Sequence, residues 1–89
     1  MSDRREALRR FGRNLCQARL GTGLTQEEVA MRAEISRSSV GRLEAGGSEC
    51  GFLTAMALAE AVGVELEELV HGGEGSGPDR TRPDRRRGR

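Results

Sequence analysis

The apolar residues of this chain recur three or four positions apart, which is the spacing of amphipathic helices. A first helix is marked by four apolar residues in steps of 3, 4 and 3, and it ends at Gly21-Thr22-Gly23. These four residues are Leu8, Phe11, Leu15 and Ala18. The strict alternation of apolar and polar residues that marks a half-buried strand is absent. The pattern therefore predicts an all-α protein.

A second helix is predicted to begin after Thr25, where two signals coincide. Thr25 and Glu28 have the spacing of a capping box, in which each side chain binds a free backbone amide at the helix start. Leu24 and Val29 flank this cap in the relation of a hydrophobic staple. The start of this helix is therefore well specified by the sequence.

The same signals recur eleven residues later and predict a third helix. Ser36 is in position to cap it, with Ile35 and Val40 in the staple relation, and Gly46-Gly47 can end it. Only Glu34 and Ile35 separate the second helix from this cap. The turn between the second and third helices is therefore very short.

Two shorter helical patterns and a polar tail complete the chain. A fourth helix is predicted over residues 52–62, with these residues directed inward: Phe52, Ala55, Leu58, Ala59 and Val62. A short fifth helix follows Gly63, with these apolar residues: Val64, Leu66 and Leu69. Residues 72–89 contain no apolar residue, so they cannot bury surface. We predict one domain over residues 1–71 and a disordered Gly/Arg-rich tail over residues 72–89.

Two short helices joined by a tight turn are typical of a helix-turn-helix unit, whose second helix enters the DNA major groove. On a helical wheel, Val40 and Leu43 define the buried face of the third helix. The other side carries small residues interleaved with arginines: Ser38, Gly41, Arg42 and Ala45, with Arg37 and Ser39 on the flanks. Small residues permit close approach to a groove, and Arg donates two hydrogen bonds to guanine. This pattern favours a DNA-reading face.

Residues 24–46, LTQEEVAMRAEISRSSVGRLEAG, closely resemble the helix-turn-helix of phage repressors and Cro, the Xre-like family of bacterial regulators. The resemblance extends over about residues 8–70. It implies a compact, lambda-repressor-like bundle of five helices with residues 36–45 as the recognition helix. It also implies that Gln26 contacts the DNA backbone, that Ser39 lies near phosphate, and that four residues face the bases: Ser36, Arg37, Ser38 and Arg42. Arg19 and Glu44 match a pair that family members bury as a structural salt bridge.

Three positions depart from the family pattern. Glu34 stands where the family usually has Gly in the turn, so a positive φ there would cost about 1 kcal/mol. The loop GGSECG, residues 46–51, has no Arg or Lys where relatives often contact phosphates, and Glu49 would repel them. Glu65 stands where Ser or Thr commonly caps the fifth helix. The arginine-rich tail either replaces the missing loop contacts or is an inert end, and both alternatives stay open.

The net charge of +1 conceals an uneven distribution of charge. All basic residues are Arg, and residues 1–46 sum to +3, residues 47–71 to −5 and the tail to +3. A basic end and an acidic end suit a polyanion that docks from one side. The acidic segment also favours an alternative from another class, a protein-interaction or antitoxin module that uses the same fold.

Several functional classes are disfavoured by the sequence. No apolar run approaches the roughly 20 residues that cross a bilayer, and the N-terminus lacks the apolar block of a signal peptide. Cys16 and Cys50 lack CxxC spacing and a His cluster, which favours two reduced thiols. His71 lies at a domain edge, and no nucleophile–base pair or phosphate loop is present. We expect a cytoplasmic protein without catalytic residues, metal or cofactor.

These observations converge on a sequence-specific, repressor-like transcriptional regulator whose partner is double-stranded DNA. We expect a homodimer on a pseudo-palindromic operator, because one recognition helix contacts too few base pairs to be selective.

Overall fold

The computed structural model describes residues 3–72, which form five α-helices and no strand. In chain order the helices are α1 (Arg4–Thr22), α2 (Gln26–Ala33), α3 (Arg37–Glu44), α4 (Phe52–Val62) and α5 (Leu66–His71). The predicted five-helix, all-α fold is confirmed over these residues. The predicted disordered tail lies outside the described residues, apart from Gly72. Within residues 3–72, no helix has both the length and the apolar character needed to span a bilayer.

The helix α1 is longer than its apolar pattern indicates, with 19 residues. Asp3 has extended backbone angles and caps the helix by accepting a hydrogen bond from the Arg5 amide at 3.4 Å. The first helical residues, Arg4, Arg5 and Glu6, are all exposed and charged. Apolar periodicity begins only at Leu8, so it could not locate this start.

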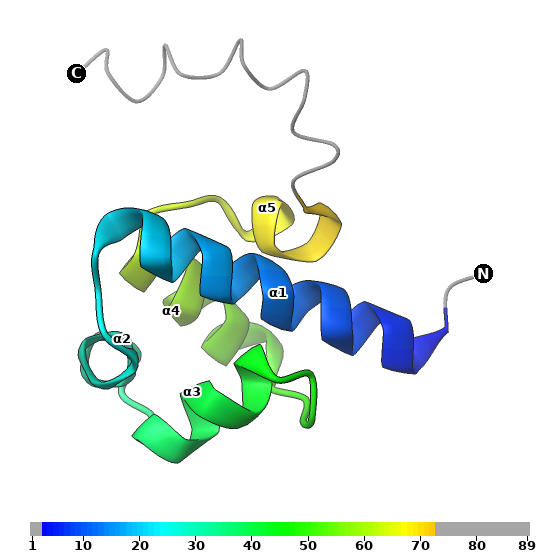
Figure 1. Cartoon of the computed structure of the whole chain (residues 1–89), viewed down its shortest axis with the longest axis horizontal. Coiled ribbons are helices and arrows are strands. Elements are labelled where there is room, and N and C mark those ends of the chain that lie inside the picture. Colours follow the sequence, from blue (N-terminus) through cyan, green and yellow to red (C-terminus); the bar gives the residue numbers. More distant parts are fainter. Residues whose placement is uncertain (1–2, 73–89) are drawn as a thin grey trace, which may run out of the picture.

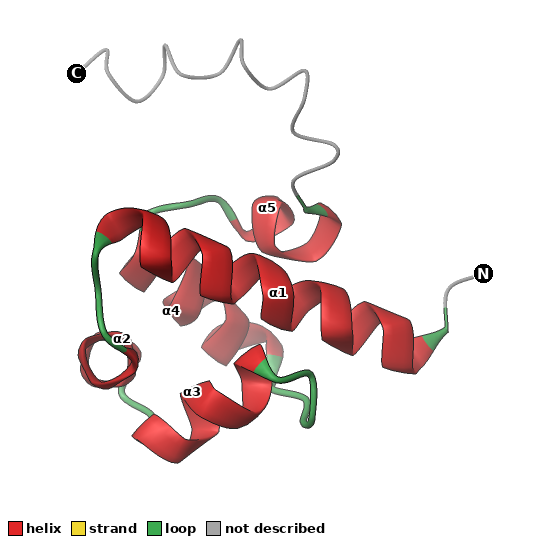
Figure 2. Cartoon of the chain, viewed as in Figure 1, coloured by secondary structure: helices red, strands yellow, loops and turns green. Residues whose placement is uncertain are grey.

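The longest helix, α1, crosses the bundle and contacts three others, α3, α4 and α5 (Figure 1). The helix that follows α1 in the sequence, α2, packs mainly against α3 and α4. Short loops join the helices (Figure 2). The largest fully buried side chains come from all five helices and contain no aromatic ring: Leu15, Val29, Val40, Leu58, Val62 and Leu69. Small aliphatic side chains therefore form the core, and they bring the helices close together.

The contact between α1 and α3 depends on Gly12. A Cβ atom at this position would lie 2.2 Å from the carbonyl oxygen of Leu43 and 2.7 Å from that of Glu44. No real contact is this short, so any side chain at Gly12 would push the two helices apart. The absence of a side chain lets the end of α3 approach the backbone of α1.

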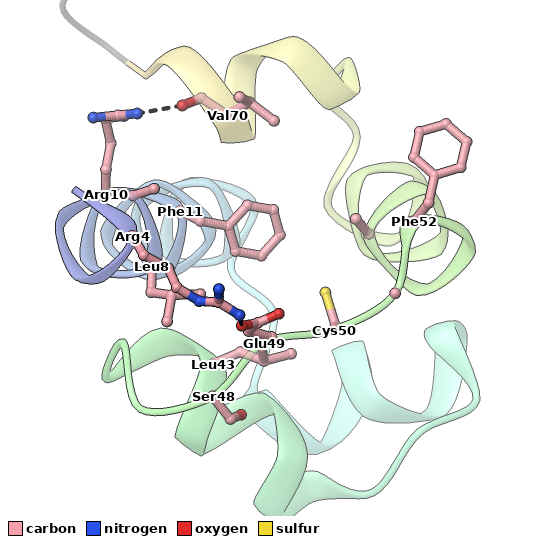
Figure 3. Close-up of a pocket in the computed structure, with 13 residues that line it drawn as sticks. Arg4, Leu8, Arg10, Phe11, Leu43, Ser48, Glu49, Cys50, Phe52 and Val70 are labelled. Atoms are coloured by element: carbon pink, nitrogen blue, oxygen red, sulfur yellow. Dashed lines mark hydrogen bonds and ion pairs between the residues drawn. The ribbon is translucent and has the colours of Figure 1, made fainter. Parts of the chain in front are cut away.

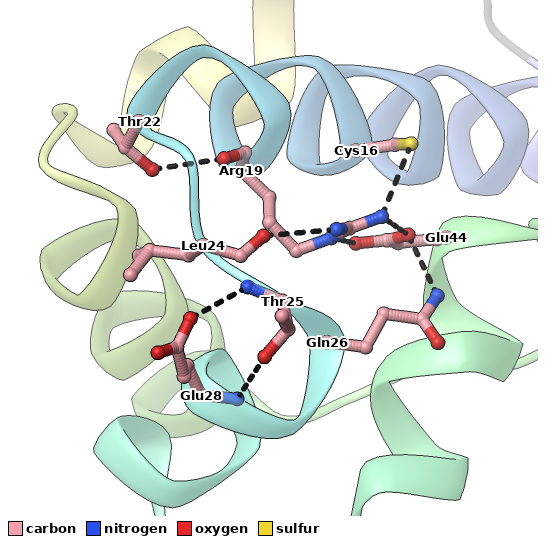
Figure 4. A network of polar contacts seen from close by, with 8 residues as sticks. All are labelled: Cys16, Arg19, Thr22, Leu24, Thr25, Gln26, Glu28 and Glu44. Carbon is pink, nitrogen blue, oxygen red and sulfur yellow. Dashed lines mark hydrogen bonds and ion pairs between the residues drawn. The ribbon is translucent and has the colours of Figure 1, made fainter.

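The predicted helix starts and buried positions of the helix-turn-helix are confirmed. In the capping box, the Thr25 amide donates to Glu28 Oε1 at 2.8 Å, and the Glu28 amide donates to Thr25 Oγ1 at 3.0 Å (Figure 4). Ser36 Oγ accepts a hydrogen bond from the Ser39 amide at 3.0 Å and so caps α3. Val40 is fully buried. Local sequence signals therefore fix the starts of both α2 and α3.

The short helix α5 is held by α1. Its N-cap, Glu65, makes no side-chain cap hydrogen bond, as the sequence departure indicated. Near its other end, Asn14 Nδ2 donates to the carbonyl oxygen of Leu69 at 2.9 Å, and Arg10 Nε donates to that of Val70 at 3.0 Å. Two long-range side-chain contacts thus satisfy backbone groups that a helix of six residues leaves free.

The predicted inward direction of Phe52 is wrong, because its side chain is 68% exposed. Phe52 lies on the same helical stripe as Ala55 and Ala59, which are buried. It is the first residue of α4, however, and it borders a surface groove instead of facing another helix (Figure 3). Helical periodicity gave the face correctly but could not show where the covering helices end.

The turn between α2 and α3 has left-handed backbone angles at Glu34, with φ 62° and ψ 44°. Glu34 is the only described residue other than glycine with a positive φ. The Ile35 amide closes the turn by donating to the carbonyl oxygen of Ala30 at 3.0 Å. The turn therefore has the geometry that suits glycine, although the sequence supplies Glu.

We expect Glu34→Gly to raise the free energy of unfolding by about 0.5–1 kcal/mol, because relief of the left-handed strain exceeds the entropy that Gly adds to the unfolded chain. Thermal melts measure the difference. Glu34→Ala is the matched control: it keeps the Cβ atom, so stability should stay close to that of the wild type. Equal effects of Gly and Ala would show that side-chain contacts, and not backbone strain, determine the stability at this turn.

Candidate nucleic-acid interface

The residues that the sequence assigned to base contact lie together at α3. Ser36, Arg37, Ser38 and Arg42 are exposed, and Ser39 is half-buried. The side chains of Arg37 and Arg42 make no hydrogen bond or ion pair with any other residue of the described part. Both guanidinium groups are therefore free to bind an external acceptor.

The three serines at the start of α3 form a cluster of hydroxyl groups. Ser36 Oγ lies 2.8 Å from Ser39 Oγ and 3.3 Å from Ser38 Oγ, in addition to accepting from the Ser39 amide. Ser36 is therefore engaged in capping the helix. Ser38 is the most peripheral of the three, because its hydroxyl makes only the longest of these contacts.

The Arg19–Glu44 pair joins the end of α3 to α1 (Figure 4). Arg19 Nε donates to Glu44 Oε2 at 2.7 Å, and Arg19 Nη2 donates to Glu44 Oε1 at 3.0 Å. The side chains are only 12% and 7% exposed, respectively. Arg19 Nη1 also donates to the carbonyl oxygen of Leu24 at 3.0 Å, and Nη2 lies 3.8 Å from Cys16 Sγ. One guanidinium therefore connects α1, the α1–α2 loop and α3.

Gln26 takes part in the same network, which the sequence did not indicate. Its Nε2 donates to Glu44 Oε1 at 2.9 Å, so this oxygen accepts from both Arg19 and Gln26. Gln26 is half-buried at the first position of α2. The contact links residues 18 positions apart in the sequence. Only the packing of α2 against α3 brings them together, so no local motif could have predicted it.

The surroundings of Glu44 stabilise its charged form. Burial alone would raise the pKa of this carboxyl, but hydrogen bonds from Arg19 and Gln26 and the nearby positive charge outweigh burial, so the pKa lies below its usual 4.5. The hydrogen bond with Glu44 raises the pKa of Arg19 above its ordinary value, against the effect of burial. Because its pKa is lower in the folded state, the ionised Glu44 carboxylate stabilises the fold above about pH 4.5. This stabilisation is lost as the pH falls through the pKa that Glu44 has in the folded state.

The loop after α3 supplies no positive charge of its own. Its Glu49 forms an ion pair with Arg4 of α1, and the two side chains are 52% and 74% exposed, respectively. An ion pair this exposed contributes little to stability. It does reduce the repulsion that Glu49 would exert on an approaching anion, because a cation now lies beside it.

Residues 17–69 match the family model described as helix-turn-helix, and the chain belongs to the Xre-like, lambda-repressor-like helix-turn-helix family of regulators. It is 41% identical over 59 residues to an uncharacterized HTH-type transcriptional regulator, y4dJ, of Sinorhizobium fredii, a match that covers 66% of this chain and 77% of that protein.

Two solved structures are also similar. The restriction-modification controller protein C.AhdI from Aeromonas hydrophila is 35% identical with a TM-score of 0.67, over 70% of this chain and 94% of that one. The clp gene regulator ClgR from C. glutamicum is 25% identical with a TM-score of 0.69, over 86% and 96% of the two chains. The family is one of transcriptional regulators.

We expect Glu44→Ala to lower the free energy of unfolding by about 3–5 kcal/mol, because the buried Arg19 guanidinium would lose its counter-charge. For a domain of this size that is a large share of the total stability. Thermal or urea unfolding measures the loss. Glu27→Ala, at an exposed position of α2, should change stability by no more than about 0.5 kcal/mol. A Glu44→Ala melt that matched the wild type would show that the pair is exposed or not formed in solution.

Proposed function

We propose that this protein is a sequence-specific, repressor-like transcriptional regulator that inserts α3 into the DNA major groove. The observation that carries the proposal is the pair of exposed guanidinium groups of Arg37 and Arg42 on one short helix, neither of which has a partner among the residues that the structure describes. Guanidinium is suited to bidentate hydrogen bonds with guanine O6 and N7. Gly41, between them, leaves room for the helix to approach the base edges.

The start of α2 is proposed to contact the DNA backbone through Gln26. Helix N-termini present free amide groups and a partial positive charge, which attract phosphate. Gln26 lies at this N-terminus, and its side chain reaches the surface of α3: a Cβ atom placed on Gly41 would lie 3.8 Å from Gln26 Oε1. Ser39, half-buried near the start of α3, is the second proposed phosphate contact.

A homodimer is proposed, because a two-half-site operator needs two recognition helices. Exposed apolar side chains of α4 and α5 offer a surface for a second copy. The first turns of α4 and the end of α5 carry exposed hydrophobic side chains: Phe52 (68% exposed), Leu53 (76%), Met56 (44%) and Val70 (40%). Phe52 and Val70 border a groove of about 410 Å³, which also lies against the N-terminal half of α1 (Figure 3). A grouping of large apolar side chains at a surface is typical of an interaction site.

The alternative function is a protein-interaction or antitoxin module that keeps the same fold. The net charge of −5 over residues 47–71 favours it, because an acidic surface suits a basic protein partner. Two of the relatives named above are a transcriptional regulator and a gene regulator by name, which supports DNA binding as the main activity.

Selection of bound sequences from random duplex DNA by the purified protein tests the proposal. Enrichment of a motif with two half-sites supports a dimeric DNA-binding regulator. Half-sites whose centres are separated by about one helical turn would fit the usual spacing of such dimers. Absence of any enriched motif would contradict the proposal and favour the protein-interaction alternative.

Arg42→Ala should relax the base preference at one position in each half-site and weaken cognate binding by about 1–3 kcal/mol, because a bidentate guanine contact is lost. Gln26→Ala should weaken binding to all duplexes alike, since phosphate contacts carry no sequence information. Affinities for the selected duplex and for a scrambled duplex separate the two effects. Equal losses on both duplexes for Arg42→Ala would contradict a base-reading role.

Leu53→Glu should shift the monomer–dimer equilibrium toward monomer by at least about tenfold, because the interface would bury an unpaired charge. Sedimentation analysis over a range of protein concentrations measures this shift. Leu20→Glu is the matched control: Leu20 is also exposed (62%), but it lies near the other end of α1 from the groove. If both variants associate like the wild type, the exposed apolar side chains of α4 and α5 do not form the dimer interface.

A further inference from the structure

The side-chain amide of Gln26 donates one hydrogen bond through its nitrogen. Its nitrogen donates to Glu44 Oε1 at 2.9 Å, while its oxygen is turned away from the carboxylate (Figure 4). A primary amide carries two N–H donors on one planar group. A hydrogen bond that holds one of them also fixes the direction of the second. The half-buried Gln26 side chain therefore has one N–H in use and one with a set direction.

The acceptor in this contact is itself immobile. Two hydrogen bonds from the same Arg19 guanidinium, at 2.7 and 3.0 Å, hold the Glu44 carboxylate, and its side chain is 7% exposed. Paired donors of this kind fix the plane of a carboxylate as well as its position. Glu44 is therefore a rigid support for the amide.

Glu44 belongs to α3, whereas Gln26 belongs to α2. The same carboxylate therefore connects the helix proposed to read bases with the residue proposed to bind phosphate. Gln26 Oε1 also lies close to α3, at 3.8 Å from the position of a Cβ atom on Gly41. The amide is thus held over the outer surface of α3, beside the residues proposed to enter the DNA major groove.

We propose that Glu44 is a positioning residue for DNA binding, which orients the Gln26 amide so that its second N–H is presented to a DNA phosphate. The inference rests on the proposed DNA-binding function. It assigns Glu44 a role beyond its pairing with Arg19: the amide is ordered before DNA arrives, so binding does not have to restrict it. A side chain free in solution would lose rotamer entropy at that step.

A double-mutant cycle in DNA affinity tests the inference. Glu44→Asp keeps the negative charge for Arg19 but withdraws the carboxylate by one methylene from Gln26. We expect Glu44→Asp and Gln26→Ala each to weaken binding about tenfold, as a hydrogen bond to a charged phosphate is lost. The double variant should be no more than about twofold weaker than Gln26→Ala alone, because both changes remove the same contact.

Two accompanying measurements isolate positioning from folding. Thermal melts of all four proteins set a temperature at which each is fully folded, and affinities are compared there. The slope of log affinity against log salt should be the same for all four, because neither change alters a charge that displaces counterions. Additive losses, with the double variant about tenfold weaker than Gln26→Ala, would overturn the inference, since Glu44 would then act independently of Gln26.

A measurement on the wild-type protein tests whether the Gln26 amide is held in place, even if Glu44→Asp fails to fold. The side-chain NH₂ group of Gln26 should show a high NMR order parameter in the free protein. Gln17, exposed on α1, is the other glutamine of the chain and serves as the internal control, with a low order parameter. Equal mobility of the two amides would overturn the inference.

The outcomes also separate this inference from the proposed function. Failure of the wild-type protein to bind any duplex would defeat the proposed function, whereas the order parameters would still report whether Glu44 holds the amide. Specific binding by the wild type combined with additive losses would defeat only the positioning role.

Discussion

The carboxylate of Glu44 at the end of α3 is the constraint on which the arrangement of the helix-turn-helix depends. It accepts hydrogen bonds from Arg19 of α1 and Gln26 of α2, so three helices meet at one group. This meeting is possible only because Gly12 lets α1 approach the carbonyl oxygens of Leu43 and Glu44. Burial of a charged pair is costly unless its hydrogen bonds are satisfied, and here both carboxylate oxygens are engaged. The pair thus defines one relative orientation of these helices more than it adds stability.

Much of the fold could be predicted from the sequence because the relevant signals are local. The capping residues Thr25 and Ser36 satisfy backbone amides within their own helices, and the periodicity of Val40 and Leu43 reports the face that is buried. The prediction errors arise where the local apolar pattern does not match the packing of the helices. Charged residues conceal the first turn of α1, and Phe52 carries the periodicity of a core residue at a place where no helix covers it.

The candidate site could be predicted only in part. The helical wheel located Arg37 and Arg42 on the outer side and flank of α3, and neither side chain has a partner within residues 3–72. The link between Gln26 and Glu44 was not predictable, because it arises from the packing of α2 on α3 and has no sequence spacing of its own. The capping role of Ser36 was predicted, whereas its contacts with the hydroxyl groups of Ser38 and Ser39 were not.

The separation of buried and exposed residues on α3 affects how such a protein can evolve. Buried residues and the Glu44 network hold the helix in place, whereas Arg37, Ser38 and Arg42 project from it and are exposed. Substitutions at exposed positions without structural partners usually change folding stability by less than about 0.5 kcal/mol. The outer face of α3 can therefore vary with little cost to the scaffold. Under the proposed role of α3 in reading bases, a lineage that carries this fold can adopt new target sequences through a few mutations while the bundle stays the same.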